Sequence, residues 1–265
     1  MMYDKPMLEI ALVQMRCEKG AIDENLASIW AYLQESAGRS VDIICFPEMS
    51  ITGYADPTQR PEAVLRLDGP QVGRFVRMTS DTQVTAIAGL IEANPNGKPF
   101  ITQIVARGGE LLGAYRKQTI ADDEVQWFAP GGQVPIFSHP KAPFSLAICA
   151  DIGNAEVFAA GARQGAQIVF EAAAPGLYGP QATRDWQAGY EWWQGECRTK
   201  LGGYARDNRV YIAVATQAGR TADEDFPGGG YVFRPDGSCA SATHDWSEGV
   251  LYATLPANNV EKERS

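Results

Sequence analysis

Short apolar segments alternate with amphipathic segments along almost all of this chain of 265 residues. The apolar segments are rich in β-branched residues and are bounded by Gly, Pro or Asp, as strands commonly are. They predict strands at residues 8–15, 41–47, 84–92, 99–107, 110–117, 144–151, 166–173, 210–217, 230–237 and 249–255. The helical patterns between them lie at residues 23–37, 70–80, 155–164 and 185–207. This alternation predicts an α/β fold whose strands are mostly buried between layers.

Turn and cap signals refine this prediction. Segments 94–99 and 235–238 are typical of tight turns and predict antiparallel hairpins within the same fold. Asp23 is the expected N-cap of the first helix. The last helix should break or bend near Gly202 and Gly203.

Composition and charge exclude several classes of protein. The formal net charge of −9 repels phosphate backbones and anionic lipid, so neither nucleic acid nor a membrane surface is expected as a partner. The beginning of the chain lacks the apolar core of a signal peptide, and no segment is long and apolar enough to span a bilayer, which predicts a cytoplasmic location. Because no linker or repeat is visible, we expect a single domain over residues 1–265, with a polar tail at about 257–265.

The cysteines are odd in number and widely spaced, at Cys17, Cys45, Cys149, Cys197 and Cys239. No Cys-x-x-Cys pair is present. This pattern argues against a disulfide framework and against a zinc site, and it fits a reducing compartment. No metal is expected.

Three reactive side chains follow apolar strands at the point where each strand ends. Glu48 follows the segment "IICFP", Lys117 follows "LLGAYR" and Cys149 follows "SLAI". Strand ends of α/β sheets are where sites are commonly built, because the scaffold is rigid and the following loop is open. A carboxylate can accept a thiol proton, and an ammonium can stabilise the oxyanion that forms when the thiolate attacks a carbonyl or nitrile carbon.

Six motifs in order resemble those of the nitrilase superfamily, the carbon–nitrogen hydrolases. They are "FPEMSITGY", "AYRKQTI", "EVQWFAPG", "ICADIGNAE", "YARDNRVYIAVA" and "FPGGGYVFRPDG". Together they cover nearly the whole chain. The resemblance implies a four-layer α-β-β-α sandwich, hydrolysis through a thioester acyl-enzyme, and no metal or organic cofactor.

The resemblance also implies roles for particular residues. Cys149 would be the nucleophile, Glu48 the general base and Lys117 the group that stabilises the tetrahedral intermediate. Glu124 would be a second glutamate that orients substrate and base, and Ala150 would supply a backbone N–H to the oxyanion. Tyr54, Ala173 and Ala174 are further expected substrate-binding residues. Ala150 stands where many members carry Tyr or Trp, and this small side chain would widen the pocket.

Four of these residues also have a simpler interpretation. Cys149 could be a packed core thiol, as is expected of Cys45, and Glu48 could satisfy free N–H groups at a helix start. Lys117 could be a solvated charge, and Glu124 could belong to an exposed acidic turn.

Other side chains have non-chemical or open interpretations. Asp151 is expected to hold the turn by a local hydrogen bond, and Glu156 to begin a helix. The aromatic segment 177–197 could be a pocket lid, or it could pack in the core or at a subunit interface. His139 and His244 have no strand-end setting, which makes a Cys-His hydrolase less favoured.

The function expected from this set is hydrolysis of a small amide. A nitrilase or an N-carbamoyl amide hydrolase using the same residues is the near alternative. A catalytically silent binding protein on the same fold is the alternative from another class. By resemblance to the family, a homodimer or higher homo-oligomer is also expected, paired through the helix at 155–164.

Overall fold

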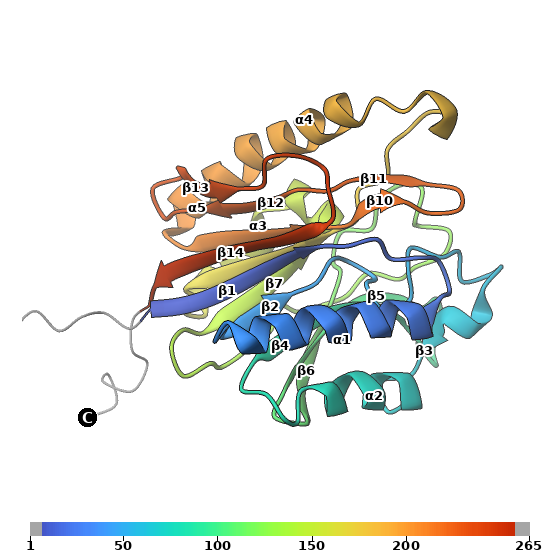
Figure 1. Cartoon of the computed structure of the whole chain (residues 1–265), viewed down its shortest axis with the longest axis horizontal. Helices are drawn as coiled ribbons and strands as arrows, with labels where there is room; N and C mark the ends of the chain where they lie inside the picture. The colour runs from blue at the N-terminus through green and yellow to red at the C-terminus, as the bar shows by residue number, and fades with distance from the viewer. Residues whose placement is uncertain (1–6, 258–265) are drawn as a thin grey trace, which may run out of the picture.

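The computed structural model describes residues 7–257, in which two β-sheets stack face to face (Figure 1). The first sheet has the order β14 (Gly249–Pro256), β1 (Met7–Gln14), β2 (Ile43–Cys45), β4 (Thr85–Glu92), β5 (Phe100–Arg107), β6 (Glu110–Arg116), with β3 (Val64–Leu65) beside β4. The second has the order β13 (Cys239–Ala242), β12 (Gly230–Phe233), β9 (Tyr211–Thr216), β8 (Ile168–Ala173), β7 (Phe144–Ile148). A separate hairpin pairs β10 (Ala218–Arg220) with β11 (Asp225–Pro227). Most of the predicted polar tail, residues 258–265, lies outside the described residues.

Helices cover the outer faces of both sheets (Figure 1). The helices α1 (Ile22–Gly38) and α2 (Pro70–Met78) lie on the first sheet, and α3 (Ala155–Arg163), α4 (Trp186–Glu196) and α5 (Gly202–Asn208) lie on the second. Short 3₁₀ segments lie at Pro61–Ala63, Cys149–Gly153 and Gln181–Thr183. The predicted four-layer α-β-β-α sandwich is therefore confirmed.

The packing of the first layer follows from the sequence of α1. Leu26, Ile29 and Leu33 are spaced by three and four residues, so they share one face and are completely buried against the sheet. The predicted N-cap is wrong, because the cap is Ala21 and Asp23 lies in the first turn. The Asp23 carboxylate instead accepts a 2.6 Å hydrogen bond from Arg74 of α2, a partner that local sequence does not reveal.

The space between the sheets is filled by apolar side chains from both of them. Leu12, Ile87, Ile148 and Phe170 are each no more than 2% exposed there, and Cys45 lies among them as predicted. The predicted turns at 94–99 and 235–238 do join antiparallel strands, β4 to β5 and β12 to β13. The short strands β3, β10, β11 and β13 were not predicted, because two to four residues give no readable alternation.

The interruption predicted near Gly202 and Gly203 takes the form of a change in helix type. A π-helical segment, Cys197–Leu201, separates α4 from α5 and ends directly before Gly202. A Cβ on Gly202 would approach the Gly237 carbonyl oxygen to 3.0 Å, so the glycine allows close packing there. Within residues 7–257, no helix is long and apolar enough to cross a membrane.

Gly89 of β4 allows the segment after β2 to cross the sheet. Its carbonyl accepts a 2.8 Å hydrogen bond from the Ile51 N–H, and its own N–H donates to Ser50 at 2.9 Å. A Cβ on Gly89 would collide with the Met49 nitrogen and the Gln103 side chain. This close approach places Glu48, the residue before Met49, over the middle of the first sheet.

We therefore predict that Gly89→Ala lowers the free energy of unfolding by about 1–3 kcal/mol or more, the usual cost of overpacking. Chemical denaturation of purified protein measures the change. Gly38→Ala at the end of α1 is the matched control, because no atom lies within 4 Å of its Cβ position. It should be neutral or stabilising by up to about 1 kcal/mol. Equal effects of the two substitutions would contradict the close approach at Gly89.

Candidate active site

The three strand-end residues come from different parts of the two sheets. Glu48 follows β2 inside the first sheet, and Lys117 follows β6 at its edge. Cys149 directly follows β7, the edge strand of the second sheet. Face-to-face stacking brings these strand ends to one place.

The ammonium of Lys117 is the centre of the site. Its side chain is 1% exposed, and its Nζ lies 2.8 Å from Glu48 Oε1 and 2.9 Å from each carboxylate oxygen of Glu124. Burial disfavours this charge, but Glu48, Cys149 and Glu124 outweigh burial and raise the pKa of Lys117. The side chain is a buried cation, and the interpretation of Lys117 as a solvated charge is wrong.

Glu124 is fixed by donors besides the lysine. Its Oε1 accepts a short hydrogen bond from the Tyr54 hydroxyl, and its Oε2 accepts one from the Ala121 N–H at 2.9 Å. The side chain is 1% exposed, so the interpretation as an exposed acidic turn is wrong. Tyr54, an expected substrate-binding residue, is thus engaged in orienting Glu124.

Glu48 is held from the second sheet as well as by Lys117. Its Oε2 accepts a 3.0 Å hydrogen bond from the N–H of Ala174, the residue after β8. Burial raises the pKa of Glu48 to about 6, the charge of Lys117 opposes the rise, and Glu124 adds to it. A carboxyl with this pKa can exchange protons near neutral pH, as a general base must.

The Cys149 thiol lies beside these groups. The interaction between the thiol and the Glu48 carboxyl is one of the smaller causes that lower the pKa of Glu48. Burial raises the pKa of Cys149, Glu48 and Glu124 raise it further, and Lys117 and the Ala174 N–H oppose them. The resting side chain is therefore a thiol, which needs a base in order to become a nucleophile.

The backbone at Cys149 is unusual. The residue has a φ of 41°, in the left-handed region that non-glycine residues rarely adopt, and it is half-buried. The 3₁₀ segment Cys149–Gly153 turns the chain sharply away from β7 at this point. The interpretation of Cys149 as a packed core thiol is not supported by this setting.

Asp151 ties the segment that begins at Cys149 to the first sheet. It accepts hydrogen bonds from the Tyr115 hydroxyl at 2.6 Å, the Thr119 N–H at 2.8 Å and the Ile148 N–H at 3.0 Å. The Ile148 contact is the predicted local hydrogen bond. The contacts with Tyr115 and Thr119 reach across to β6 and the chain that follows it, which the sequence did not indicate.

The remaining expected residues lie around the same place. Ala150 is half-buried next to the thiol. The Ala173 carbonyl accepts a 2.8 Å hydrogen bond from the Gln217 N–H, and the Ala174 N–H is engaged by Glu48. Glu156 lies in the first turn of α3, whose N-cap is Asn154, so it begins the helix as predicted.

A cavity of about 380 Å³ lies over Tyr54 and Trp127 and is rimmed by Lys19 and Glu224. Because Tyr54 reaches Glu124 beneath it, this cavity approaches the buried charges from the surface.

The aromatic segment 177–197 divides into two parts. Tyr190 and Trp193 are buried, whereas Tyr178 is 87% and Trp192 46% exposed.

One buried carboxyl close to the site was missed by sequence reasoning. Glu171 in β8 is 0% exposed, and neither of its oxygens has a hydrogen-bond partner. Burial, followed by the charges of Asp151 and Glu48, raises its pKa well above the ordinary value, and only Lys117 opposes this. A single Glu within the apolar run "AQIVFEAA" was the only available signal.

His244 is exposed, and His139 is buried near Asp42 and Arg107, where desolvation is the main cause that lowers its pKa to about 4. Across residues 7–257, no group of three or more His, Cys, Asp or Glu side chains is arranged to hold a metal ion.

The α-β-β-α layers and the buried Lys–Glu–Glu set beside a thiol are the arrangement that the resemblance to the carbon–nitrogen hydrolases implies. The sequence model described as "Carbon-nitrogen hydrolase" matches residues 9–264. The chain belongs to the carbon–nitrogen hydrolase family.

Individual relatives are distant. The chain is 25% identical to a probable nitrilase of Schizosaccharomyces pombe over 96% of this chain and 91% of that protein. It is 23% identical to a glutamine-dependent NAD(+) synthetase of Acinetobacter baylyi over 97% of this chain, but it spans only 45% of that protein's length. Among solved structures, the amidase of Nesterenkonia sp. AN1 superposes with a TM-score of 0.78 at 23% identity, over 94% of this chain and 90% of that one. That structure is a variant with the acetamide moiety of fluoroacetamide added covalently at the active-site cysteine.

The unpaired carboxyl of Glu171 predicts a pH-dependent stability. Its pKa is raised in the folded protein and ordinary, about 4.3, in the unfolded chain, so its contribution becomes unfavourable as pH rises above about 4. Glu171→Gln removes this titration while keeping the size of the side chain. Its gain in unfolding free energy should grow by up to about 1.4 kcal/mol per pH unit between pH 5 and 8.

Denaturant unfolding at several pH values measures this gain. The exposed Glu156→Gln is the control and should show no gain that grows with pH. A difference between Glu171→Gln and the unsubstituted protein that stays constant across this range would mean that Glu171 is ionised in the folded state.

Proposed function

We propose that this protein hydrolyses a carbon–nitrogen bond in a small amide through a cysteine thioester. The observation that carries the proposal is the buried Lys117 ammonium, held between Glu48 and Glu124 at 2.8–2.9 Å beside the Cys149 thiol. A buried cation with two carboxylates and a protonated thiol is costly to maintain for stability alone. Membership of the carbon–nitrogen hydrolase family supports the same reaction class.

In the first half of the reaction, Glu48 takes the thiol proton as the Cys149 sulfur attacks the amide carbonyl carbon. The oxygen of the tetrahedral intermediate becomes negative and is stabilised by Lys117 and by the backbone N–H of Ala150. When the carbonyl re-forms, the carbon–nitrogen bond breaks. Glu48 returns its proton to the leaving amine, and the acyl group remains on sulfur as a thioester.

In the second half, a water molecule attacks the thioester carbonyl while Glu48 accepts one of its protons. The second tetrahedral intermediate uses the same Lys117 and Ala150 groups. Its collapse breaks the carbon–sulfur bond, releases the carboxylic acid and returns the proton to the thiol. Glu124 keeps Lys117 charged and in place throughout, because it contacts the Nζ with both carboxylate oxygens.

The relatives support amides and leave nitriles as a second candidate. The Nesterenkonia amidase, which has a similar fold, carries a covalent adduct at its active-site cysteine. The likeness to a probable nitrilase over 96% of this chain is the observation that favours nitriles. The acyl group and the leaving amine are not specified by either likeness, and the homodimer stays a prediction.

The central test replaces the nucleophile. Cys149→Ala should abolish turnover of every substrate that the unsubstituted protein accepts from a panel of small amides, ureido acids and nitriles. Mass spectrometry after a brief substrate soak should show an acyl adduct on Cys149 in the unsubstituted protein. Cys239→Ala, which removes a half-buried thiol on β13, is the control and should remain active.

Retained turnover in Cys149→Ala would refute the mechanism, and activity on nitriles alone would favour the second candidate. Absence of both turnover and adducts in all assays would favour the silent binding protein.

The pKa of Glu48 predicts the acid limb of the activity. Because Glu48 must be ionised to accept the thiol proton, kcat/KM should fall about tenfold per pH unit below about pH 6. Glu124 raises the pKa of Glu48, so Glu124→Gln should move this limb to lower pH, whatever its effect on the maximal rate. Initial rates across pH measure both profiles. A limb that moves to higher pH in Glu124→Gln would contradict this coupling.

A further inference from the structure

The segment after β8 carries the N–H group that holds the proposed base. Ala174 donates this hydrogen bond to Glu48 Oε2 at 3.0 Å. The segment is fixed on both sides, because the Ala173 carbonyl accepts from Gln217 and the Leu177 N–H donates to the Asp225 carbonyl, each at 2.8 Å. The position of Ala174 therefore depends on the contacts that hold the loop between β8 and α4.

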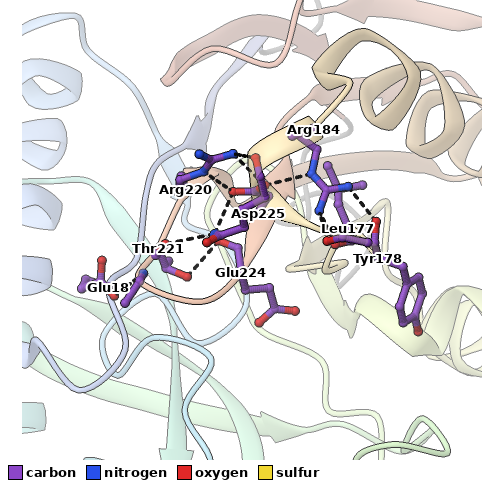
Figure 2. A network of polar contacts seen from close by, with 11 residues as sticks. Glu18, Leu177, Tyr178, Arg184, Arg220, Thr221, Glu224 and Asp225 are labelled. Atoms are coloured by element: carbon purple, nitrogen blue, oxygen red, sulfur yellow. Dashed lines mark hydrogen bonds and ion pairs between the residues drawn. The ribbon is translucent and has the colours of Figure 1, made fainter.

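The Asp225 side chain anchors this loop (Figure 2). The residue lies on β11, is 0% exposed, and is approached by two guanidinium groups from different sides (Figure 2). Arg184 Nε donates to Oδ2 and Arg220 Nε to Oδ1, both at 2.8 Å, and the Gln181 amide donates to Oδ1 at 3.1 Å. Burial tends to raise the pKa of Asp225, but these hydrogen bonds outweigh it and lower the pKa, so the side chain is ionised.

Arg184 links the Asp225 carboxylate to the loop backbone (Figure 2). While Nε is engaged by Asp225, its two terminal nitrogens donate to three consecutive carbonyls, those of Leu177 at 2.8 Å, Tyr178 at 2.7 Å and Gly179 at 3.0 Å. The Arg184 side chain is only 10% exposed. The planar fork of arginine can make these contacts at once, whereas a lysine ammonium cannot reach them all.

The loop has little freedom to move between these contacts. Gly176 lies against the Glu224 carboxylate so closely that a Cβ would collide with it. Pro175, which has a restricted φ, directly follows Ala174. A displacement at Leu177 would therefore be transmitted to Ala174 over three residues.

We propose that Asp225, acting through Arg184, is a positioning residue that sets where the Ala174 N–H meets Glu48. This inference rests on the proposed function for the role of Glu48, but the contacts that carry it are independent of that role. Asp225 does not touch the reacting groups. Its carboxylate fixes the loop that supplies one of the two donors to the base, the other being Lys117.

Asp225→Asn tests the inference, because Asn keeps the size but loses the charge and one acceptor oxygen. Loss of an N–H donor disfavours the ionised carboxylate, so the acid limb of kcat/KM should move to higher pH. We expect kcat to fall about 10- to 100-fold with KM little changed, the effect of a misplaced catalytic group. The alkylation of Cys149 by iodoacetamide, followed by site-resolved mass spectrometry across pH, should shift in the same direction without needing a substrate.

Two further variants make the test decisive. Asp236→Asn removes an exposed carboxylate on the β12–β13 turn and should leave both profiles unchanged. Arg184→Lys keeps the charge but loses the fork, and it should reproduce the shift; it decides the test if Asp225→Asn fails to fold.

The inference is overturned if folded Asp225→Asn retains the acid limb and the alkylation profile of the unsubstituted protein. If Asp225→Asn does not fold, the same result with folded Arg184→Lys overturns it. The proposed function fails separately, if Cys149→Ala remains active. The two failures are therefore distinguishable.

Discussion

The ammonium of Lys117 is the constraint on which the site depends. A cation that is 1% exposed is tolerated only where opposite charges compensate the loss of water, and Glu48 and Glu124 provide this compensation at 2.8–2.9 Å. The two carboxylates could not be packed so closely without the cation between them. Each member of the set therefore makes the burial of the others possible, and the thiol beside them experiences a field fixed by the fold.

The packing of the two sheets against each other also determines the geometry of the site. Glu48 belongs to the first sheet and receives its N–H donor from Ala174, which follows a strand of the second. In the opposite direction, Asp151 follows a strand of the second sheet and receives the Tyr115 hydroxyl from the first. A shift of one sheet against the other would change both links together, so the apolar side chains between the sheets also determine the spacing of the reactive groups.

The sequence allowed the strand-end residues Glu48, Lys117 and Cys149 to be predicted, because a polar side chain directly after an apolar run is a local signal. It allowed the sandwich to be predicted through the family resemblance. The anchoring role of Asp225 could not be predicted, since it depends on two arginines that only the fold brings together. The Ala21 cap was missed for a similar reason, because Asp23 is drawn to a residue of another helix.

The backbone at Cys149 has a consequence for how such a chain changes over generations. Its φ of 41° costs energy in any residue with a side chain beyond hydrogen, and glycine would relieve that cost. Selection for stability alone would therefore favour glycine at this position, which has no thiol. Stability and the proposed reactivity therefore make opposite demands on this position, and a glycine variant should gain thermal stability as it loses the thiol.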